Sequence, residues 1–244
     1  MANRSRSSSR QYFSPEWFPP GVKWLLIINV SIFLILFFST RFTGAGRWYS
    51  GFQLQPASVV RVGAIWQLVT YCFLHSEPLE FFWNGLYLYW LGTMLEPLWG
   101  TKRFLQFYFS CAVGGAVVAI IGTYLFYDPK TPFRGASGAI FGLLVGFGFA
   151  FAGQVFWGIM AQYLALLVGA LQFFLTLDSR GAFFAHLGGM LVGFAYMLYF
   201  RGRRVPILSN KLGSYYKQWK ADRARKKFQV YIRKNSSDRD PWAN

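Results

Sequence analysis

Three polar side chains lie inside long apolar stretches of this 244-residue chain, where polar groups are costly and often functional. Ser137 begins the run SGAIFGLL, His186 lies in AHLGGMLVGF, and Asn84 lies in FFWNGLYLYW. A serine hydroxyl becomes a good nucleophile when an imidazole beside it accepts its proton. A side-chain amide can donate a hydrogen bond to the oxyanion that such an attack creates. Together these residue types predict acyl-transfer chemistry, provided that the fold brings them together.

Glycines accompany the serine and the histidine at helical spacing. The first stripe is Gly135, Gly138, Gly142 and Gly146, and the second is Gly189 and Gly193. Small residues let membrane helices approach closely, so we expect the two helices to dock and to bring His186 toward Ser137. Gly135 also leaves the backbone beside Ser137 open to an incoming peptide. The alternative is that these glycines serve packing alone and that the serine is a helix cap.

The composition predicts a membrane protein, since 54% of the residues are hydrophobic and 14% are charged. Lipid cannot satisfy free backbone groups, so the apolar segments are expected to be helices. We expect an all-α, polytopic bundle of six transmembrane helices, over about 22–38, 79–98, 103–126, 137–151, 155–176 and 182–200. The long connection 39–78 is rich in aromatic residues, among them Trp66 and Tyr71, which predicts a loop at the membrane interface.

The basic residues are concentrated outside the apolar block, although the net charge of +16 would suggest nucleic acid in a water-soluble protein. Their distribution favours cytoplasmic termini and argues against a nucleic-acid partner. We expect three parts: a basic segment 1–21, a membrane domain 22–200 and a basic tail 201–244. The tail is either an amphipathic helix on anionic lipids or a solvated chain.

Metal and cofactor chemistry is not indicated by the sequence. The chain has two cysteines without CxxC spacing and two histidines, so neither a zinc site nor a disulfide framework is expected. We therefore expect a protein without cofactors. His75 and Glu96 are interpreted as structural residues, the first as a hydrogen-bonding side chain and the second as a partner or cap at the turn near Gly100.

The motifs GASGAIFGLL and AHLGGMLVGF, in this order on a six-segment frame, resemble those of the rhomboid intramembrane serine proteases. The stretch WQLVTYCFLHSEPLEFFWNGLYLYWLGTMLEPLWGTKRFLQFYF resembles their long first loop and their second and third helices. The resemblance covers about residues 22–200. It implies a serine endopeptidase that cleaves transmembrane segments of other proteins. The absence of a clear transit peptide or a seventh segment favours a bacterial inner membrane.

The resemblance also implies roles for individual residues. Ser137 would be the nucleophile and His186 the base of a dyad that needs no acidic third member. Asn84 and the Ser137 backbone N–H would form the oxyanion hole, and Trp83 would lie near the substrate entrance between the second and fifth segments.

Glu80 departs from the family pattern, because family members usually carry a histidine four residues before the asparagine. One interpretation is that Glu80 turns toward outer water, and that Asn84 and the Ser137 backbone N–H stabilise the oxyanion without it. The other is that burial keeps the carboxyl neutral, so that it donates to the oxyanion. Two other functions stay open: an inactive relative that binds transmembrane helices, and a transporter, for which the segments have few midplane polar groups.

Overall fold

The computed structural model describes residues 18–42, 48–75, 77–175 and 182–201. Residues Met1–Leu198 form one compact unit and Tyr199–Asn244 form another. Helices α1 to α7 and most of α8 belong to the first unit. The basic segment before residue 18 and the tail beyond 201 lie outside the described residues, so the domain boundaries and the lipid contacts of the tail stay predictions.

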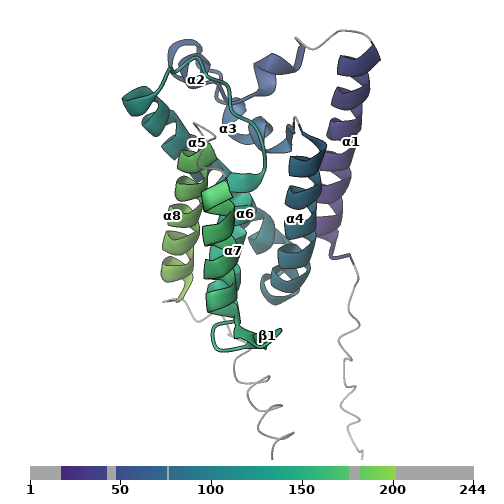
Figure 1. Cartoon of the computed structure of the whole chain (residues 1–244), viewed down its shortest axis with the longest axis vertical. Coiled ribbons are helices and arrows are strands. Elements are labelled where there is room, and N and C mark those ends of the chain that lie inside the picture. The colour runs from purple at the N-terminus through teal and green to yellow at the C-terminus, as the bar shows by residue number, and fades with distance from the viewer. Residues whose placement is uncertain (1–17, 43–47, 76, 176–181, 202–244) are drawn as a thin grey trace, which may run out of the picture. The chain divides into compact units, whose positions relative to one another are not determined.

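Six long helices correspond to the six predicted segments, which confirms the all-α helical class (Figure 1). They are α1 (Pro20–Phe42), α4 (Pro78–Trp99), α5 (Thr101–Phe126), α6 (Ser137–Ala150), α7 (Ala161–Leu175) and α8 (Ala182–Arg201). Within the described residues, three stretches are long and apolar enough to cross a membrane, namely Pro20–Thr40, Thr101–Phe126 and Ala182–Phe200. Helices α6 and α7 are apolar but shorter.

The connection between α1 and α4 folds into short helices at the upper end of the bundle in Figure 1. These are η1 (Trp48–Phe52), α2 (Pro56–Val62), α3 (Gln67–Thr70) and η2 (Tyr71–Phe73). The Gln67 side chain ties them together, because its Oε1 accepts from the Gln55 N–H at 2.9 Å and its Nε2 donates to the Gly51 carbonyl at 3.1 Å. Trp66 is exposed, whereas Tyr71 is 1% exposed and belongs to the core. The position of this connection at the membrane interface stays a prediction.

The predicted start of the fifth helix is wrong. Residues 155–160 form a small hairpin in which β1 (Val155–Phe156) pairs antiparallel with β2 (Ile159–Met160), and α7 begins only at Ala161. Two glycines and Trp157 in this region have positive φ angles, a conformation that a helix cannot accommodate. The residues of the hairpin are apolar, and hydrophobicity alone does not distinguish a short hairpin from the first turn of a membrane helix.

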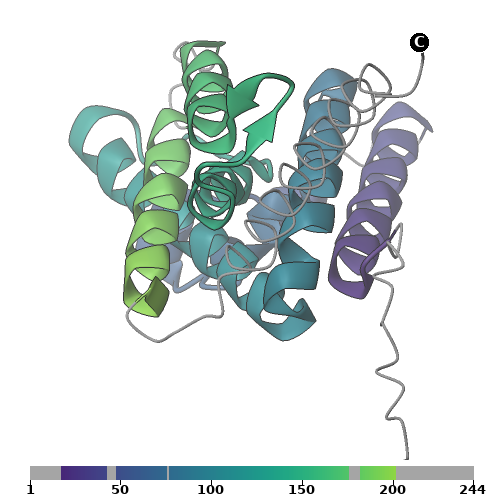
Figure 2. The same ribbon diagram turned by 90° about the horizontal axis from the view of Figure 1, so that it is seen from below.

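Helix α6 occupies the middle of the bundle and packs against α4, α5 and α7 (Figures 1 and 2). Its sequence is apolar on all sides, as expected for a helix surrounded by others. Helix α1 lies beside α4 in both views. The helix that begins with Ser137 is therefore the most enclosed element of the fold.

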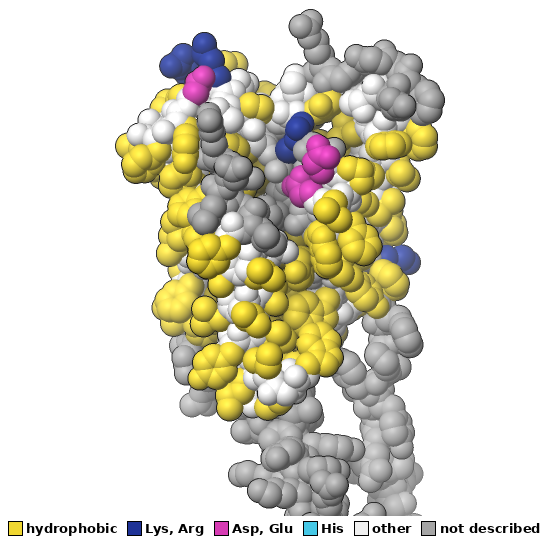
Figure 3. Space-filling model, in the orientation of Figure 1, with side chains coloured by type: hydrophobic (Ala, Val, Ile, Leu, Met, Phe, Trp, Pro, Cys, Tyr) yellow, Lys and Arg dark blue, Asp and Glu magenta, His cyan; other side chains and the backbone are white. Residues whose placement is uncertain are grey.

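The sides of the bundle are covered by apolar side chains, whereas most charged side chains on the face in Figure 3 gather near the upper end. Leu166, Leu171 and Phe174 of α7 are each more than half exposed, and many residues of α1 are similar. A water-soluble monomer rarely exposes so extensive an apolar surface. With the spanning helices, this surface identifies a multi-pass membrane protein.

Glu96 joins three helices at the other end of α4, as its structural interpretation predicts. Its buried carboxylate accepts hydrogen bonds from the N–H groups of Gly21 and Val22, both at 2.8 Å, and from the Thr101 hydroxyl at 2.6 Å. A carboxylate at a helix N-terminus satisfies free N–H groups and complements the helix dipole. Glu96 thus caps α1 and fixes it to the turn between α4 and α5.

Candidate active site

The chain that leads into Ser137 is held by the first connection. Leu54 and Phe133 exchange backbone hydrogen bonds of 2.9 and 2.7 Å, and the Gly135 N–H donates to the Tyr71 carbonyl at 3.0 Å. Two residues later α6 begins with Ser137. The half-buried serine therefore sits where a constrained loop becomes a buried helix, and its backbone N–H is among those of the first helical turn, which have no partner within the helix.

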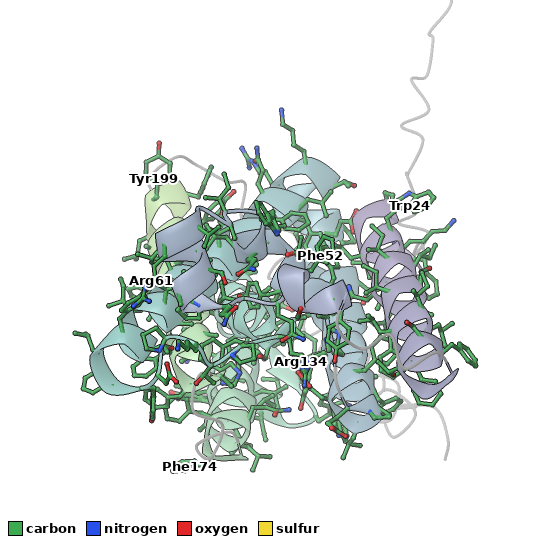
Figure 4. All side chains as sticks on the ribbon, turned by 90° about the horizontal axis from the view of Figure 1, so that it is seen from above. Trp24, Phe52, Arg61, Arg134, Phe174 and Tyr199 are labelled. Carbon is green, nitrogen blue, oxygen red and sulfur yellow. The ribbon has the colours of Figure 1, made fainter. Side chains whose placement is uncertain are left out.

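Gly135 has a φ of +117°, a conformation that favours glycine, and its missing side chain leaves space beside the serine. A Cβ atom at this position would lie 2.5 Å from Glu80 Oε1 and 3.9 Å from Ser137 Oγ. The Glu80 carboxyl and the Ser137 hydroxyl thus flank the same small space. Arg134, which precedes the glycine, is seen near the middle of the upper end in Figure 4.

Helices α6 and α8 touch backbone to backbone, which confirms the docking predicted from the two glycine stripes. A Cβ on Gly189 would collide with the Gly138 carbonyl, and one on Gly193 would lie 3.1 Å from Gly142 Cα. A Cβ on Gly138 would lie 3.1 Å from the carbonyl oxygen of Ala185, the residue before His186. The neighbours of the serine and the histidine are therefore in direct contact.

His186 is fully buried, and its ring stacks on Phe141 with a centroid distance of 4.1 Å and an interplanar angle of 20°. Phe141 follows Ser137 by four residues, so the two share one face of α6, one turn apart. Helical side chains also lean toward the N-terminus of their helix, which is the Ser137 end. The structure thus holds the imidazole on the face of α6 that carries the serine.

Asn84 is buried on α4, and its Nδ2 has no hydrogen-bond partner within the described residues. It lines a cavity of about 270 Å³ together with Ala136, the residue before Ser137. Helices α4 and α6 pack against each other, so a free amide donor lies beside the segment that carries the serine. This is the kind of group that an oxyanion requires.

Trp83 lies next to Asn84 in sequence but is 44% exposed. Its ring packs edge-on against Phe82 at 5.5 Å and lies 6.2 Å from Tyr87. These aromatic residues form a partly exposed group on α4. The role of Trp83 at a substrate entrance stays a prediction.

Two residues near the site were not found by sequence reasoning. Tyr71 donates its hydroxyl to the Ala112 carbonyl at 2.7 Å, and a Cβ on Gly138 would lie 3.3 Å from that hydroxyl oxygen. Tyr71 therefore connects the first connection, α5 and the start of α6. Phe141 supports the imidazole, and its spacing of one helical turn from the serine is the signal that could have identified it.

His75 is a buried residue of the first connection, 5% exposed, and packs edge-on against Phe81 at 5.5 Å. Its ring also interacts with the backbone of Phe73, in keeping with a structural role. It lines the same cavity as Asn84.

Comparison with known proteins identifies the family of this chain. Residues 62–203 match the Rhomboid domain, which is more than half of the chain. The chain belongs to the rhomboid family. The matched range includes every candidate site residue and leaves out α1.

Individual relatives are similar over part of their length. The chain is 31% identical to Rhomboid-like protease 3 of Toxoplasma gondii over 147 residues, which cover 56% of this chain and 52% of that protein. It is 28% identical to Rhomboid protease GluP of Bacillus subtilis over 52% of this chain and 24% of GluP. RHOMBOID-like protein 2 of Arabidopsis thaliana is 24% identical over 80% of this chain and 72% of its own length. The chain thus spans about half or less of the first two relatives.

Proposed function

We propose that this protein is an intramembrane serine endopeptidase with Ser137 as nucleophile and His186 as general base. The observation that carries the proposal is the stacking of His186 on Phe141, one helical turn from the serine on the same face of α6. Family membership and the names of the relatives, two of which are called proteases, support the same activity.

The reaction follows from the chemistry of the two side chains. The His186 imidazole takes the Ser137 hydroxyl proton while Oγ attacks the carbonyl carbon of a peptide bond. The tetrahedral intermediate collapses as the imidazolium gives its proton to the leaving amine, which leaves an acyl-enzyme. A water molecule, deprotonated by His186, then releases the acyl group and regenerates the serine.

The oxyanion is stabilised by Asn84 Nδ2 and the Ser137 backbone N–H. The amide is a buried donor without another partner among the described residues, so it can bind a developing negative charge without first breaking a hydrogen bond. Helix N-termini also attract anions. Gly135 has no side chain of its own, which leaves room for the Glu80 carboxyl beside the serine.

Glu80 is proposed to stabilise the same oxyanion. Its Oε1 faces Gly135 beside the serine, which favours the interpretation in which a neutral carboxyl donates to the oxyanion. An ionised carboxylate at that position would repel the negative charge. The carboxyl is thus proposed to take the role that a histidine has in other family members.

The substrates are proposed to be transmembrane segments of other proteins, which reach the site from the lipid past Trp83. We also propose that both chain termini lie in the cytoplasm, from the distribution of basic residues. Membrane lipids surround the bundle, and no cofactor is needed for the chemistry described.

The test is cleavage of a generic transmembrane substrate by the purified protein in liposomes, together with labelling by a fluorophosphonate probe. Cleavage and labelling should be lost in Ser137→Ala, and cleavage should be lost in His186→Ala. Ser31→Ala, which changes an exposed serine of α1, should retain both. Activity in Ser137→Ala equal to that of the native chain would refute the assignment.

An inactive relative that binds transmembrane helices is the second candidate, and the replacement of a family histidine by Glu80 is the observation that favours it. Failure of the native chain both to cleave and to react with the probe, combined with binding of a transmembrane peptide, would support this function.

A further inference from the structure

The hairpin between α6 and α7 has no part in the catalytic proposal, and it reaches toward α4. It packs on α7 and extends from the lower end of that helix toward α4 in Figures 1 and 2. Helices α4 and α7 each pack against α6 but have little direct contact with each other. The hairpin is closed by a hydrogen bond of 2.8 Å from the Ala161 N–H to the Gln154 carbonyl, at the point where α7 begins. A contact made by the hairpin therefore restrains the first turn of α7.

Trp157 occupies a backbone position that a bulky residue rarely adopts. It forms the two-residue turn of the hairpin with Gly158, and the φ angles of the two residues are +48° and +85°. Positive φ at both residues is the pattern of a type I′ turn, which strongly favours asparagine and glycine. Such outliers persist only when the surrounding structure holds them, and they often mark functional positions. The side chain of Trp157, and not the turn, is thus the feature that needs an explanation.

The Trp157 indole makes a contact with α4. Its ring centroid lies 5.7 Å from that of Trp90, within the range of a favourable aromatic pair. Trp90 lies 5.5 Å from the buried ring of Phe147 on α6, and Phe156 of the hairpin lies 5.4 Å from the same ring. Aromatic rings therefore form a continuous series from α4 through α6 to the hairpin. Trp157 itself is 80% exposed, so its loss would leave no cavity in the core.

We propose that Trp157 is a strap that holds the start of α7 to α4. The contact between the two indoles exists only while the two helices lie close at the hairpin end, so it stabilises that arrangement against their separation. Ser137 begins α6 at the end opposite the hairpin. The strap thus restrains α4 and α7 most strongly at the end away from the serine. Its effect on substrate entry between these helices rests on the proposed function, whereas the strap itself does not.

Double electron–electron resonance of the full chain in liposomes tests the strap. Nitroxides on Lys102→Cys and Tyr163→Cys, at exposed positions just after α4 and on the first turn of α7, report the separation at the hairpin end. The buried Cys72 and Cys111 are replaced by alanine, so that only the two introduced positions carry a label. We expect a narrow distance distribution in this background and a clearly broader one when Trp157→Asn is added. Equal distributions would overturn the proposal.

The choice of substitutions separates the indole from the turn. Asparagine is favoured in this turn, so Trp157→Asn removes the ring while the hairpin stays folded. Trp90→Leu removes the other ring and should broaden the distribution to the same extent, with no further effect when both changes are combined. Val155→Thr changes another exposed residue of the hairpin and should leave the distribution narrow. Broadening by Val155→Thr as large as that by Trp157→Asn would overturn the specific role of the indole.

Substrate entry has its own readout. Trp157→Asn should raise kcat/KM for a transmembrane substrate by roughly two- to tenfold, the range that the loss of one aromatic pair allows. Fluorophosphonate labelling of Ser137 should keep its rate, because a small probe does not require α4 and α7 to separate. An unchanged kcat/KM in a variant with a broadened distribution would overturn the effect on entry. A broadened distribution with no labelling of Ser137 in the native chain would instead refute the protease function and keep the strap.

Discussion

The His186 imidazole lies flat against the Phe141 ring, with 4.1 Å between centroids and an inclination of 20°. This contact joins α8 to α6 one turn below Ser137 and sets the plane of the ring that is proposed to move the proton. The proposed dyad has no acidic member to orient its histidine, so stacking on Phe141 contributes to the orientation of the ring.

Phe141→Leu should therefore lower the reactivity of Ser137 as a nucleophile while the protein stays folded. An aromatic pair contributes about 0.5–1.5 kcal/mol beyond its buried area, so we expect a decrease of roughly three- to tenfold. The measurement is the rate of fluorophosphonate labelling of Ser137, which does not depend on substrate binding. Phe141→Tyr keeps the ring and should retain most of the rate, and equal rates in all three proteins would rule out an orienting role.

Asn84→Ala should reduce cleavage by roughly 10²–10³-fold, because the removal of one oxyanion donor typically has this effect on kcat. The change in KM should be small, since the donor acts mainly on the transition state. Gln106→Ala removes an exposed amide of α5 and is the matched control. A decrease in kcat/KM that comes entirely from KM would assign Asn84 to substrate binding instead.

The sequence was sufficient to predict the helices and the pairing of α6 with α8, because apolar runs and glycine spacing are local patterns. Ser137 at the start of α6 was predicted for the same reason. The backbone hydrogen bond of Gly135 and the burial of Tyr71 depend on contacts between residues far apart in the chain. A local sequence pattern does not contain this information.

The hairpin at 155–160 and the cavity around Asn29 show two further causes of error. The hairpin is set by backbone conformations at Gly153, Trp157 and Gly158, and the residues between them are as apolar as a helix. Asn29 was overlooked because a single asparagine in an apolar run has no periodic signal. Only the packing of α1 beside α4 places it at the same cavity as His75.

Glu96→Ala should destabilise the fold strongly without altering the site directly. It removes a buried acceptor of three hydrogen bonds, and each bond to a charged group contributes about 1.5–3 kcal/mol. Some of these donors can regain water, so we expect a loss of about 3–5 kcal/mol in the free energy of unfolding, measured by denaturant titration in micelles. Thr101→Val removes one of the three bonds and should lose about 1–2 kcal/mol. Equal stability of Glu96→Ala and the native chain would contradict the capping role.

Cys72 should be unreactive in the folded protein. Burial raises the pKa of this thiol to about 12, so the reactive thiolate is scarce at pH 8. In a Cys111→Ala background, which leaves one thiol, N-ethylmaleimide should label Cys72 only after denaturation. Because the folded pKa is raised, this residue contributes stability below its unfolded pKa of about 8.5 that is lost as the pH rises toward 12. Rapid labelling of the folded protein at pH 8 would show that the first connection opens.

Glu80→Gln distinguishes the two interpretations of the carboxyl beside Gly135. A neutral acid that donates to the oxyanion loses this function when it ionises, so native activity should fall at high pH through Glu80. The glutamine amide donates at every pH, so the variant should remain active and should keep its rate at high pH. Asp128→Asn changes an exposed carboxylate of the loop after α5 and should leave the native profile unchanged. Identical pH–rate profiles for Glu80→Gln and the native chain would mean that the carboxyl takes no part in the reaction, and Asn84 with the Ser137 N–H would then hold the oxyanion alone.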